Sequence, residues 1–184
     1  MTEQIKQAAQ RARVGIIIGS NRTARIGGEI AQWVAQTMTN AAFTTQMIDL
    51  AAINLPFLNE PDVPAHGNCQ NATTKDFAGT IAACDAFVLV FPQYNWGYPA
   101  VLKNALDTVF AEWNGKPVGT VIYGGHSMQA VIAIRLVLMG LRMRQLATNV
   151  AIHTEDGADV HAELQPYAPL VAQMSREQGL RLQH

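Results

Sequence analysis

Residues 19–28 combine the residue types that could bind a phosphate group. The segment reads GSNRTARIGG and separates an apolar, β-branched run from an expected helix. At such a junction backbone N–H groups converge and the helix dipole favours an anion. Ser20 and Arg22 could add a hydroxyl and a charge-assisted hydrogen bond. The pattern is neither GxGxxG nor GxxxxGK(S/T), so the usual dinucleotide and nucleoside-triphosphate sites are not expected. The alternative is a plain loop with two solvated arginines.

Residues 91–99, FPQYNWGYP, have side chains that suit a flat ring with polar edges. Tyr94 and Trp96 offer aromatic faces or edges, and Gln93 and Asn95 can hydrogen bond to ring heteroatoms. The segment follows an apolar run and leads to Pro99, which suits the first turn of a helix. In an open α/β sheet, ligands bind in such loops at the carboxyl ends of strands. The alternative is an ordinary strand–helix connection that happens to be aromatic.

Two further segments contain histidines but match no catalytic or metal pattern. Residues 124–129 read GGHSMQ, which lacks the G-x-S-x-G pattern of a hydrolase nucleophile. Residues 153–161 read HTEDGADVH and match neither an EF-hand loop nor HExxH. A solvated acidic loop is the favoured interpretation of the second segment, and we expect no metal site.

Apolar runs alternate with helical patterns, which predicts a parallel sheet with helices on both faces. The natural order for five strands is 2-1-3-4-5, in which the first and third strands meet at the switch point. Both ligand-like segments follow these two strands, so we expect a ligand with a phosphate at one end and a flat heteroaromatic ring at the other, such as FMN. Strands are expected at 14–18, 43–50, 86–90, 118–123 and 146–152, and helices at 29–39, 73–83, 99–111, 128–141 and 164–182, with an irregular, proline-rich segment at 55–71.

The composition limits the classes of protein to which this chain can belong. With 184 residues, 49% hydrophobic and 15% charged, the chain is expected to form one domain over residues 13–184, preceded by a leader at 1–12. The net charge of -1 gives no support for a nucleic-acid partner. Cys69 and Cys84 have no metal-like spacing and favour a reducing compartment. No apolar run reaches the roughly 20 residues of a membrane helix and no signal peptide is evident, so a soluble, cytoplasmic protein is expected.

The two ligand-like segments resemble the NAD(P)H-dependent FMN reductase family, which has the flavodoxin-like fold. The resemblance covers roughly residues 13–150 and rests on Gly19-Ser20-Asn21-Arg22, on Pro92-Gln93-Tyr94-Asn95, and on Pro99, Leu102-Lys103-Asn104-Ala105 and Asp107. Many members have a serine and an asparagine where this chain has Arg25 and Gly27, and further glycines after Gly125. The cofactor-binding residues that the resemblance implies are Gly19, Ser20, Arg22, Arg25, Ile26 and Gly27 for the phosphate, and Pro92, Gln93, Tyr94, Asn95, Trp96, Tyr123, Gly124, Gly125 and Ser127 around the ring.

The resemblance implies a flavin-dependent oxidoreductase. FMN would accept a hydride from NADH or NADPH and pass electrons to a small-molecule acceptor, which could be a quinone, free flavin, an azo compound or a metal oxyanion. The protein would hold the ring and leave one face open, so no side chain is named as catalytic. Two alternatives stay open: a flavodoxin-type electron carrier, a class that is usually strongly acidic, and a flavin-binding regulatory protein without turnover.

The expected helix at 128–141 predicts self-association. It is apolar nearly all round, with Gln129 and Arg135 as its strongly polar residues. A sheet can cover only one side of a helix, which would leave Val131, Leu138 or their neighbours exposed. We therefore expect a homodimer, or a dimer of dimers, through helices 99–111 and 128–141. The alternative is a central helix covered by the C-terminal segment.

Overall fold

The structure is a computed structural model that describes residues 12–40, 43–125, 127–154 and 159–183. The expected leader at 1–12 therefore lies, apart from Ala12, outside the described residues. The acidic part of the 153–161 segment and His126 also lie outside them. Among the described residues no group of histidine, cysteine and carboxylate side chains could hold a metal ion. No helix in these ranges is long and apolar enough to cross a bilayer.

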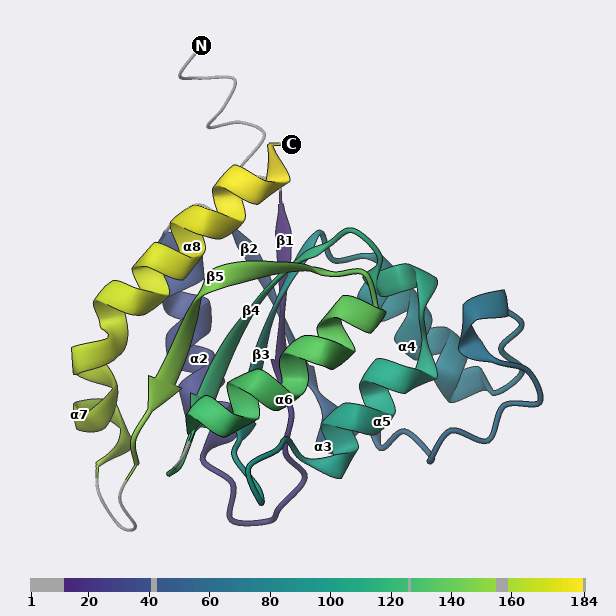
Figure 1. The fold of residues 1–184 in the computed structure, drawn as a ribbon, viewed down its shortest axis with the longest axis horizontal. Coiled ribbons are helices and arrows are strands. Elements are labelled where there is room, and N and C mark those ends of the chain that lie inside the picture. Colours follow the sequence, from purple (N-terminus) through teal and green to yellow (C-terminus); the bar gives the residue numbers. More distant parts are fainter. Residues whose placement is uncertain (1–11, 41–42, 126, 155–158, 184) are drawn as a thin grey trace.

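Five parallel strands form one sheet in the order β2-β1-β3-β4-β5, which confirms the predicted topology (Figure 1). Every residue of β3 and β4 is buried, because helices cover both faces of these central strands. The third strand is longer than expected and includes Phe91 and Pro92, so the aromatic loop begins at Gln93. The strands are β1 Arg13–Ile18, β2 Thr44–Asp49, β3 Ala86–Pro92, β4 Pro117–Tyr123 and β5 Arg144–Ile152.

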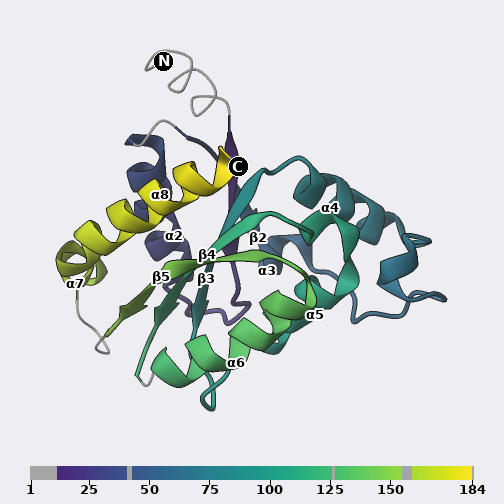
Figure 2. The ribbon, with the colours of Figure 1, turned by 45° about the horizontal axis from the view of Figure 1, so that its top comes forward.

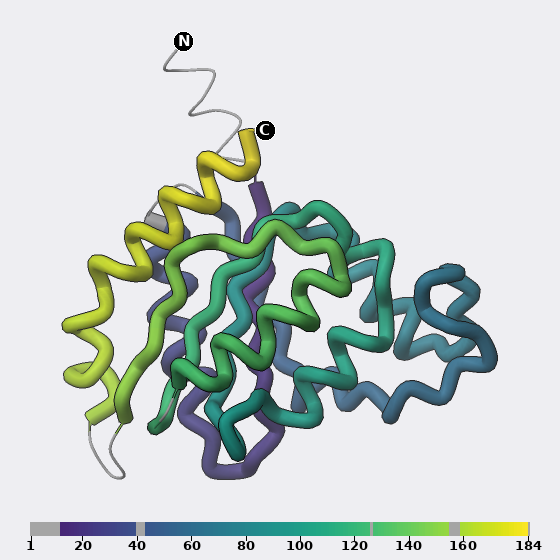
Figure 3. Tube along the Cα trace, in the orientation of Figure 1, coloured from purple at the N-terminus to yellow at the C-terminus, as the bar shows by residue number. Residues whose placement is uncertain are grey.

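Two hydrophobic cores, one on each face of the sheet, hold the layers together. Helices α2 and α8 cover one face, and α3, α4, α5 and α6 cover the other (Figures 1 and 2). The trace ends with α8 beside the start of β1 (Figure 3). The helices are α2 Gly27–Asn40, α3 Leu50–Ile53, α4 Ala72–Ala82, α5 Ala100–Thr108, α6 Ser127–Gly140, α7 Val160–Leu164 and α8 Ala168–Leu182, with 3-10 turns at Pro64–His66, Ala111–Trp113 and Gln165–Tyr167.

Two helix predictions need correction. The expected helix at 99–111 ends at Thr108, because Val109 is extended and a separate 3-10 turn follows. The expected helix at 164–182 begins only at Ala168, as α8, because Leu164 ends a separate helix, α7, and residues Gln165–Tyr167 form a 3-10 turn. Pro166 and Pro169 lie in first turns, where the missing N–H groups leave no hydrogen bond broken.

Helix α6 exposes an apolar stripe to solvent. Met128, Ile132, Leu136 and Met139 are 61–71% exposed and follow one another at helical spacing. Val131 and Leu138, which the sequence favoured as exposed, are instead buried against the sheet. The C-terminal helix α8 packs against α2, β4 and β5 on the opposite face, so the alternative that it covers α6 is wrong.

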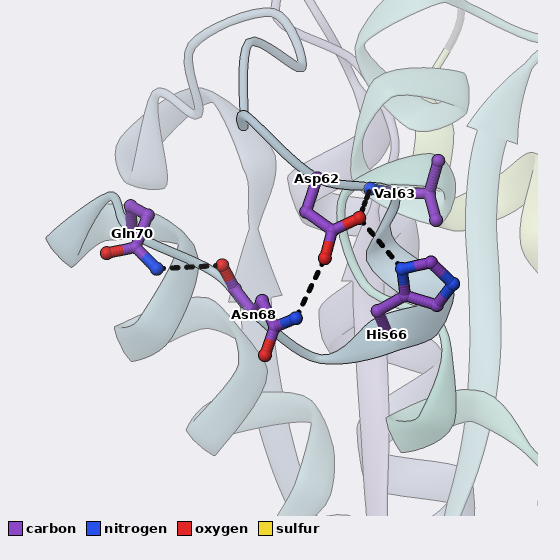
Figure 4. Close-up of polar contacts among 5 residues, drawn as sticks. All are labelled: Asp62, Val63, His66, Asn68 and Gln70. Atoms are coloured by element: carbon purple, nitrogen blue, oxygen red, sulfur yellow. Dashed lines mark hydrogen bonds and ion pairs between the residues drawn. The ribbon is translucent and has the colours of Figure 1, made fainter.

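The irregular segment 54–71 projects beyond α4 and α5 (Figure 3) and is ordered by side chains. Asp62 accepts hydrogen bonds of 2.8 Å from the Val63 N–H, the His66 ring and the Asn68 amide (Figure 4). The Glu60 carboxylate accepts from the backbone N–H groups of the next helix entry, at 2.6 Å from Gln70. Two carboxylates thus accept hydrogen bonds from backbone N–H groups of a segment whose own backbone pairing is limited to the turn at Pro64–His66.

Acidification should loosen this segment before it unfolds the sheet. The Asn68 amide and then His66 lower the pKa of Asp62, and the Gln70 N–H lowers the pKa of Glu60. Since both folded-state pKa values lie below the ordinary ones, their stabilisation is complete above pH about 4–4.5 and is lost as the pH falls through the lowered values. Hydrogen exchange at pH 6 and at about pH 3, corrected for intrinsic rates, should show lost protection at Val63 and Gln70. Protection of β3 serves as the control, and equal protection of the segment at both pH values would contradict this assignment.

Candidate cofactor site

Three loops meet at the carboxyl edge of the sheet, as predicted for the switch point. They are the β1–α2 loop at 19–26, the β3–α5 loop at 93–99 and the β4–α6 loop around Gly124. The Gly19 N–H donates to the Val90 carbonyl at 2.8 Å, and the Gln93 N–H donates to the Tyr123 carbonyl at 3.0 Å. Because β1, β3 and β4 are adjacent and parallel, the two ligand-like segments lie side by side.

The β1–α2 loop is packed closely against the sheet at its start and open at its middle. A Cβ atom on Gly19 would lie 3.0 Å from Phe91 and 3.2 Å from Leu102, so a larger residue here would force these two side chains to shift. Ser20 is buried. Arg22 is exposed, and among the described residues its side chain makes one hydrogen bond, a long one of 3.3 Å from Nη2 to the Ala24 carbonyl. Most of its guanidinium therefore remains available to a ligand.

Tyr123 places a buried hydroxyl at the N-terminus of α2. A Cβ atom on Gly27 would lie 2.7 Å from Tyr123 Oη, so the glycine makes room for the phenol. Burial first, and then Tyr94, raise the pKa of Tyr123 to about 12, so the phenol stays protonated at neutral pH. Ser20 approaches and lowers this pKa in turn, but the Tyr123 hydroxyl has no hydrogen-bond partner among the described residues. An unpaired donor at a helix N-terminus fits an anionic oxygen.

The β3–α5 loop forms a tight turn that exposes two aromatic side chains. Tyr94 and Gly97 exchange backbone hydrogen bonds of 3.1 and 2.8 Å. Between them Asn95 and Trp96 both have left-handed backbone, at φ 48° and 65°, as in a type I′ turn. Tyr94 is 40% exposed and Trp96 is 63% exposed. A tryptophan in this conformation is strained, and such strain is often found at ligand sites.

Gln93 joins the aromatic turn to the β4–α6 loop. Its Oε1 accepts from the Trp96 N–H at 3.2 Å, and its Nε2 donates to the Gly125 carbonyl at 2.9 Å. Ser127 donates to the Gly124 carbonyl at 3.1 Å, where Gly124 has φ 96°. These contacts hold the two loops at a fixed separation.

The structure thus brings the predicted site residues together at one edge but gives some of them internal partners. Pro92 is buried in β3, the Ser127 hydroxyl is bonded within its own loop, and Arg25 is paired with Asp49. Asp49 and the Tyr123 hydroxyl are the two features that the sequence did not indicate. The only sequence signal for Asp49 is its place between a strand and a helix, which suits an N-cap.

A family model described as NADPH-dependent FMN reductase matches residues 12–157. The chain belongs to this family. An NAD(P)H-dependent FMN reductase of Saccharomyces cerevisiae is 40% identical over 144 residues, which cover 71% of this chain and 75% of the yeast protein. A 2-hydroxy-1,4-benzoquinone reductase of a Burkholderia species is 27% identical, covering 72% of this chain and 66% of that protein. The fold matches an oxidoreductase structure from Corynebacterium diphtheriae with a TM-score of 0.73 and 19% identity, covering 94% of this chain and 97% of that one.

Replacing Trp96 by glycine should stabilise the protein while disturbing the site of this FMN reductase. Glycine removes the left-handed strain, worth roughly 1–2 kcal/mol, and loses the burial of only the smaller part of the indole surface, because Trp96 is 63% exposed. Urea denaturation should show the higher free energy of unfolding, and the spectrum or potential of bound flavin should shift. Tyr94→Ala, at a residue outside the positive-φ set, is the control that should gain no stability. A less stable Trp96→Gly variant would show that the indole contributes more than its strain costs.

Proposed function

We propose that this protein uses FMN at the β1/β3 edge to oxidise NADPH or NADH and to reduce a small-molecule acceptor. Membership of the FMN reductase family supports the reaction class. The observation that carries the proposal is the pairing of two complementary loops at one edge. The β1–α2 loop has an available arginine and leads to a helix N-terminus, beside which the buried phenol of Tyr123 at the end of β4 has no hydrogen-bond partner among the described residues. The β3–α5 loop exposes aromatic rings on a fixed turn.

The residues at this edge fit the two ends of FMN. Ser20, Arg22 and the backbone N–H groups of 19–27 would hold the phosphate, with the Tyr123 hydroxyl as a further donor. The aromatic loop from Gln93 to Trp96, which follows the buried Pro92 at the end of β3, would line the isoalloxazine ring. FMN, when bound, supplies hydride acceptance from the nicotinamide and electron delivery to the second substrate. The chain's own residues bind and orient the ring, and Tyr123 keeps its proton throughout because its pKa is about 12.

The acceptor is proposed to be a planar or compact small molecule that reaches the aromatic turn. A quinone, a free flavin, an azo compound and a metal oxyanion are the candidates, and a relative named as a benzoquinone reductase favours the first. Tyr94 and Trp96 are exposed, so their rings are open to a planar acceptor. We further propose that residues 13–184 act as a single domain in the cytoplasm, which agrees with the free thiols of Cys69 and Cys84.

The apolar stripe on α6 supports a homodimer as the working form, or a dimer of dimers. Its four side chains, Met128, Ile132, Leu136 and Met139, run along one exposed line of the helix. On a monomer such a row would favour aggregation. A two-fold axis that pairs the α5 and α6 helices of two copies would cover it. Since α6 begins at Ser127, two residues after Gly125, and Gln93 of the aromatic loop donates to the Gly125 carbonyl, this arrangement would bring the partner close to the aromatic turn.

The visible spectrum of the purified protein, followed by NADPH addition without oxygen, tests the proposed function. A flavin spectrum that bleaches on NADPH addition and returns with a quinone is expected, with sustained NADPH oxidation in steady state. Bleaching without turnover would favour the electron carrier, although the net charge of -1 is far from that of a strongly acidic carrier. A protein that binds FMN but is not bleached by NADPH would favour the flavin-binding regulatory alternative. A colourless protein that binds no added FMN would overturn the proposal.

A further inference from the structure

Arg25 joins the β1–α2 loop to the neighbouring strand β2. Its Nη1 donates to the Ser20 carbonyl at 2.7 Å, and its Nη2 donates to Asp49 Oδ2 at 2.6 Å. The two side chains are only 23% and 28% exposed. Asp49 also accepts from the Ala51 N–H at 3.1 Å through Oδ1 and so caps α3. One ion pair therefore connects a loop backbone, the end of a strand and the start of a helix.

The sheet register explains why this pair can form. Asp49 is paired with Ile18, the residue directly before Gly19, so its carboxylate lies at the same edge as the loop. The pair is shielded from water more than a typical surface ion pair, which strengthens both hydrogen bonds of the guanidinium. Arg22 is instead exposed, and its one side-chain hydrogen bond to a described residue is the 3.3 Å contact within its own loop.

We infer that Arg25 and Asp49 are a positioning pair that sets the β1–α2 loop for the phosphate, and that Arg25 is not itself the phosphate ligand. This inference rests on the proposed function. In a planar trans peptide the C=O and the following N–H point in opposite directions. Because Arg25 binds the Ser20 carbonyl, the Asn21 N–H points away from Arg25. The same contact prevents the Ser20 carbonyl oxygen from facing a bound anion. Asp49 neutralises the charge of Arg25, which leaves Arg22 to supply positive charge.

The variants Arg25→Ala, Asp49→Asn and their combination test this role. Asparagine keeps the N-cap of α3 but removes the ion pair. We expect each single variant to weaken FMN binding about tenfold, which corresponds to about 1.4 kcal/mol, and the double variant to be no weaker than the worse single one. Riboflavin binding should stay unchanged in all three. In the flavin-free variants, the backbone amide hydrogens of residues 20–26 should exchange with solvent faster than they do in the flavin-free wild type.

A direct phosphate ligand would give a different pattern. Asp49→Asn would then leave FMN binding unchanged or tighten it by freeing Arg25, and only Arg25→Ala would weaken it. That result, or unchanged exchange of residues 20–26 in both single variants, would overturn the inference. Asp76→Asn, the same charge change at an exposed position of α4, is the control and should change neither readout. If the wild type bound no FMN, the proposed function would fail, while the exchange measurement would still decide whether the pair orders the loop.

Discussion

Replacing Arg22 by alanine should weaken FMN binding about 10- to 150-fold. The guanidinium is exposed in the β1–α2 loop, and within the part of the chain that the structure describes its one hydrogen bond is the 3.3 Å contact with the Ala24 carbonyl. It is therefore free to form a charge-assisted bond with the phosphate, worth about 1.5–3 kcal/mol, and each 1.4 kcal/mol is a factor of about ten in affinity. Quenching of FMN fluorescence during titration of the flavin-free protein measures the change.

Two comparisons make the Arg22 result specific. Riboflavin lacks the phosphate, so it should bind more weakly than FMN. Its affinity should be the same for the wild type and the variant. The thermal stability of the flavin-free variant should also match the wild type, because an exposed side chain with one long contact contributes little to folding. Equal FMN affinity in wild type and Arg22→Ala would remove Arg22 from the site. If riboflavin binding fell by the same factor, Arg22 would act on binding of the isoalloxazine ring and not on binding of the phosphate.

Replacing Leu136 by lysine should convert the proposed dimer into a monomer of about 20 kDa. Leu136 is 71% exposed in the middle of the stripe formed by Met128, Ile132 and Met139. If a second copy covers it, the change removes about 1.5–3 kcal/mol of burial from each copy. Two copies lose at least about 3 kcal/mol, which raises the dissociation constant at least about 150-fold. A buried, unpaired ammonium would add to this loss.

Light scattering at micromolar concentration measures the mass. Leu180→Lys on α8 is the matched control, because Leu180 is 61% exposed but lies on the opposite face of the sheet. This variant should keep the mass of the wild type. A wild-type protein that is already a stable monomer would rule out the dimer, and a Leu136→Lys variant with unchanged mass would place the interface elsewhere.

The sequence by itself determined the order of the elements and the location of the site. The apolar runs that became β1, β3 and β4 alternate with helical patterns, and this alternation leaves few possible topologies. The glycine–serine–arginine segment and the aromatic segment follow two of these strands directly. Their meeting at the sheet edge therefore follows from chain order and parallel pairing. These signals are local, so a single sequence contains them.

Only the tertiary structure decided how particular side chains are used. The pairing of Arg25 with Asp49 depends on the register between β1 and β2, across 24 residues of sequence. The exposed line of α6 depends on how that helix is rotated on the sheet, and a helix apolar all round contains no pattern that fixes its rotation. The left-handed backbone of Trp96 is held by Gln93 and by the Tyr94–Gly97 hydrogen bonds, against the residue's own preference. Periodicity and composition describe neighbours along the chain, whereas each of these features depends on contacts between segments that folding brings together.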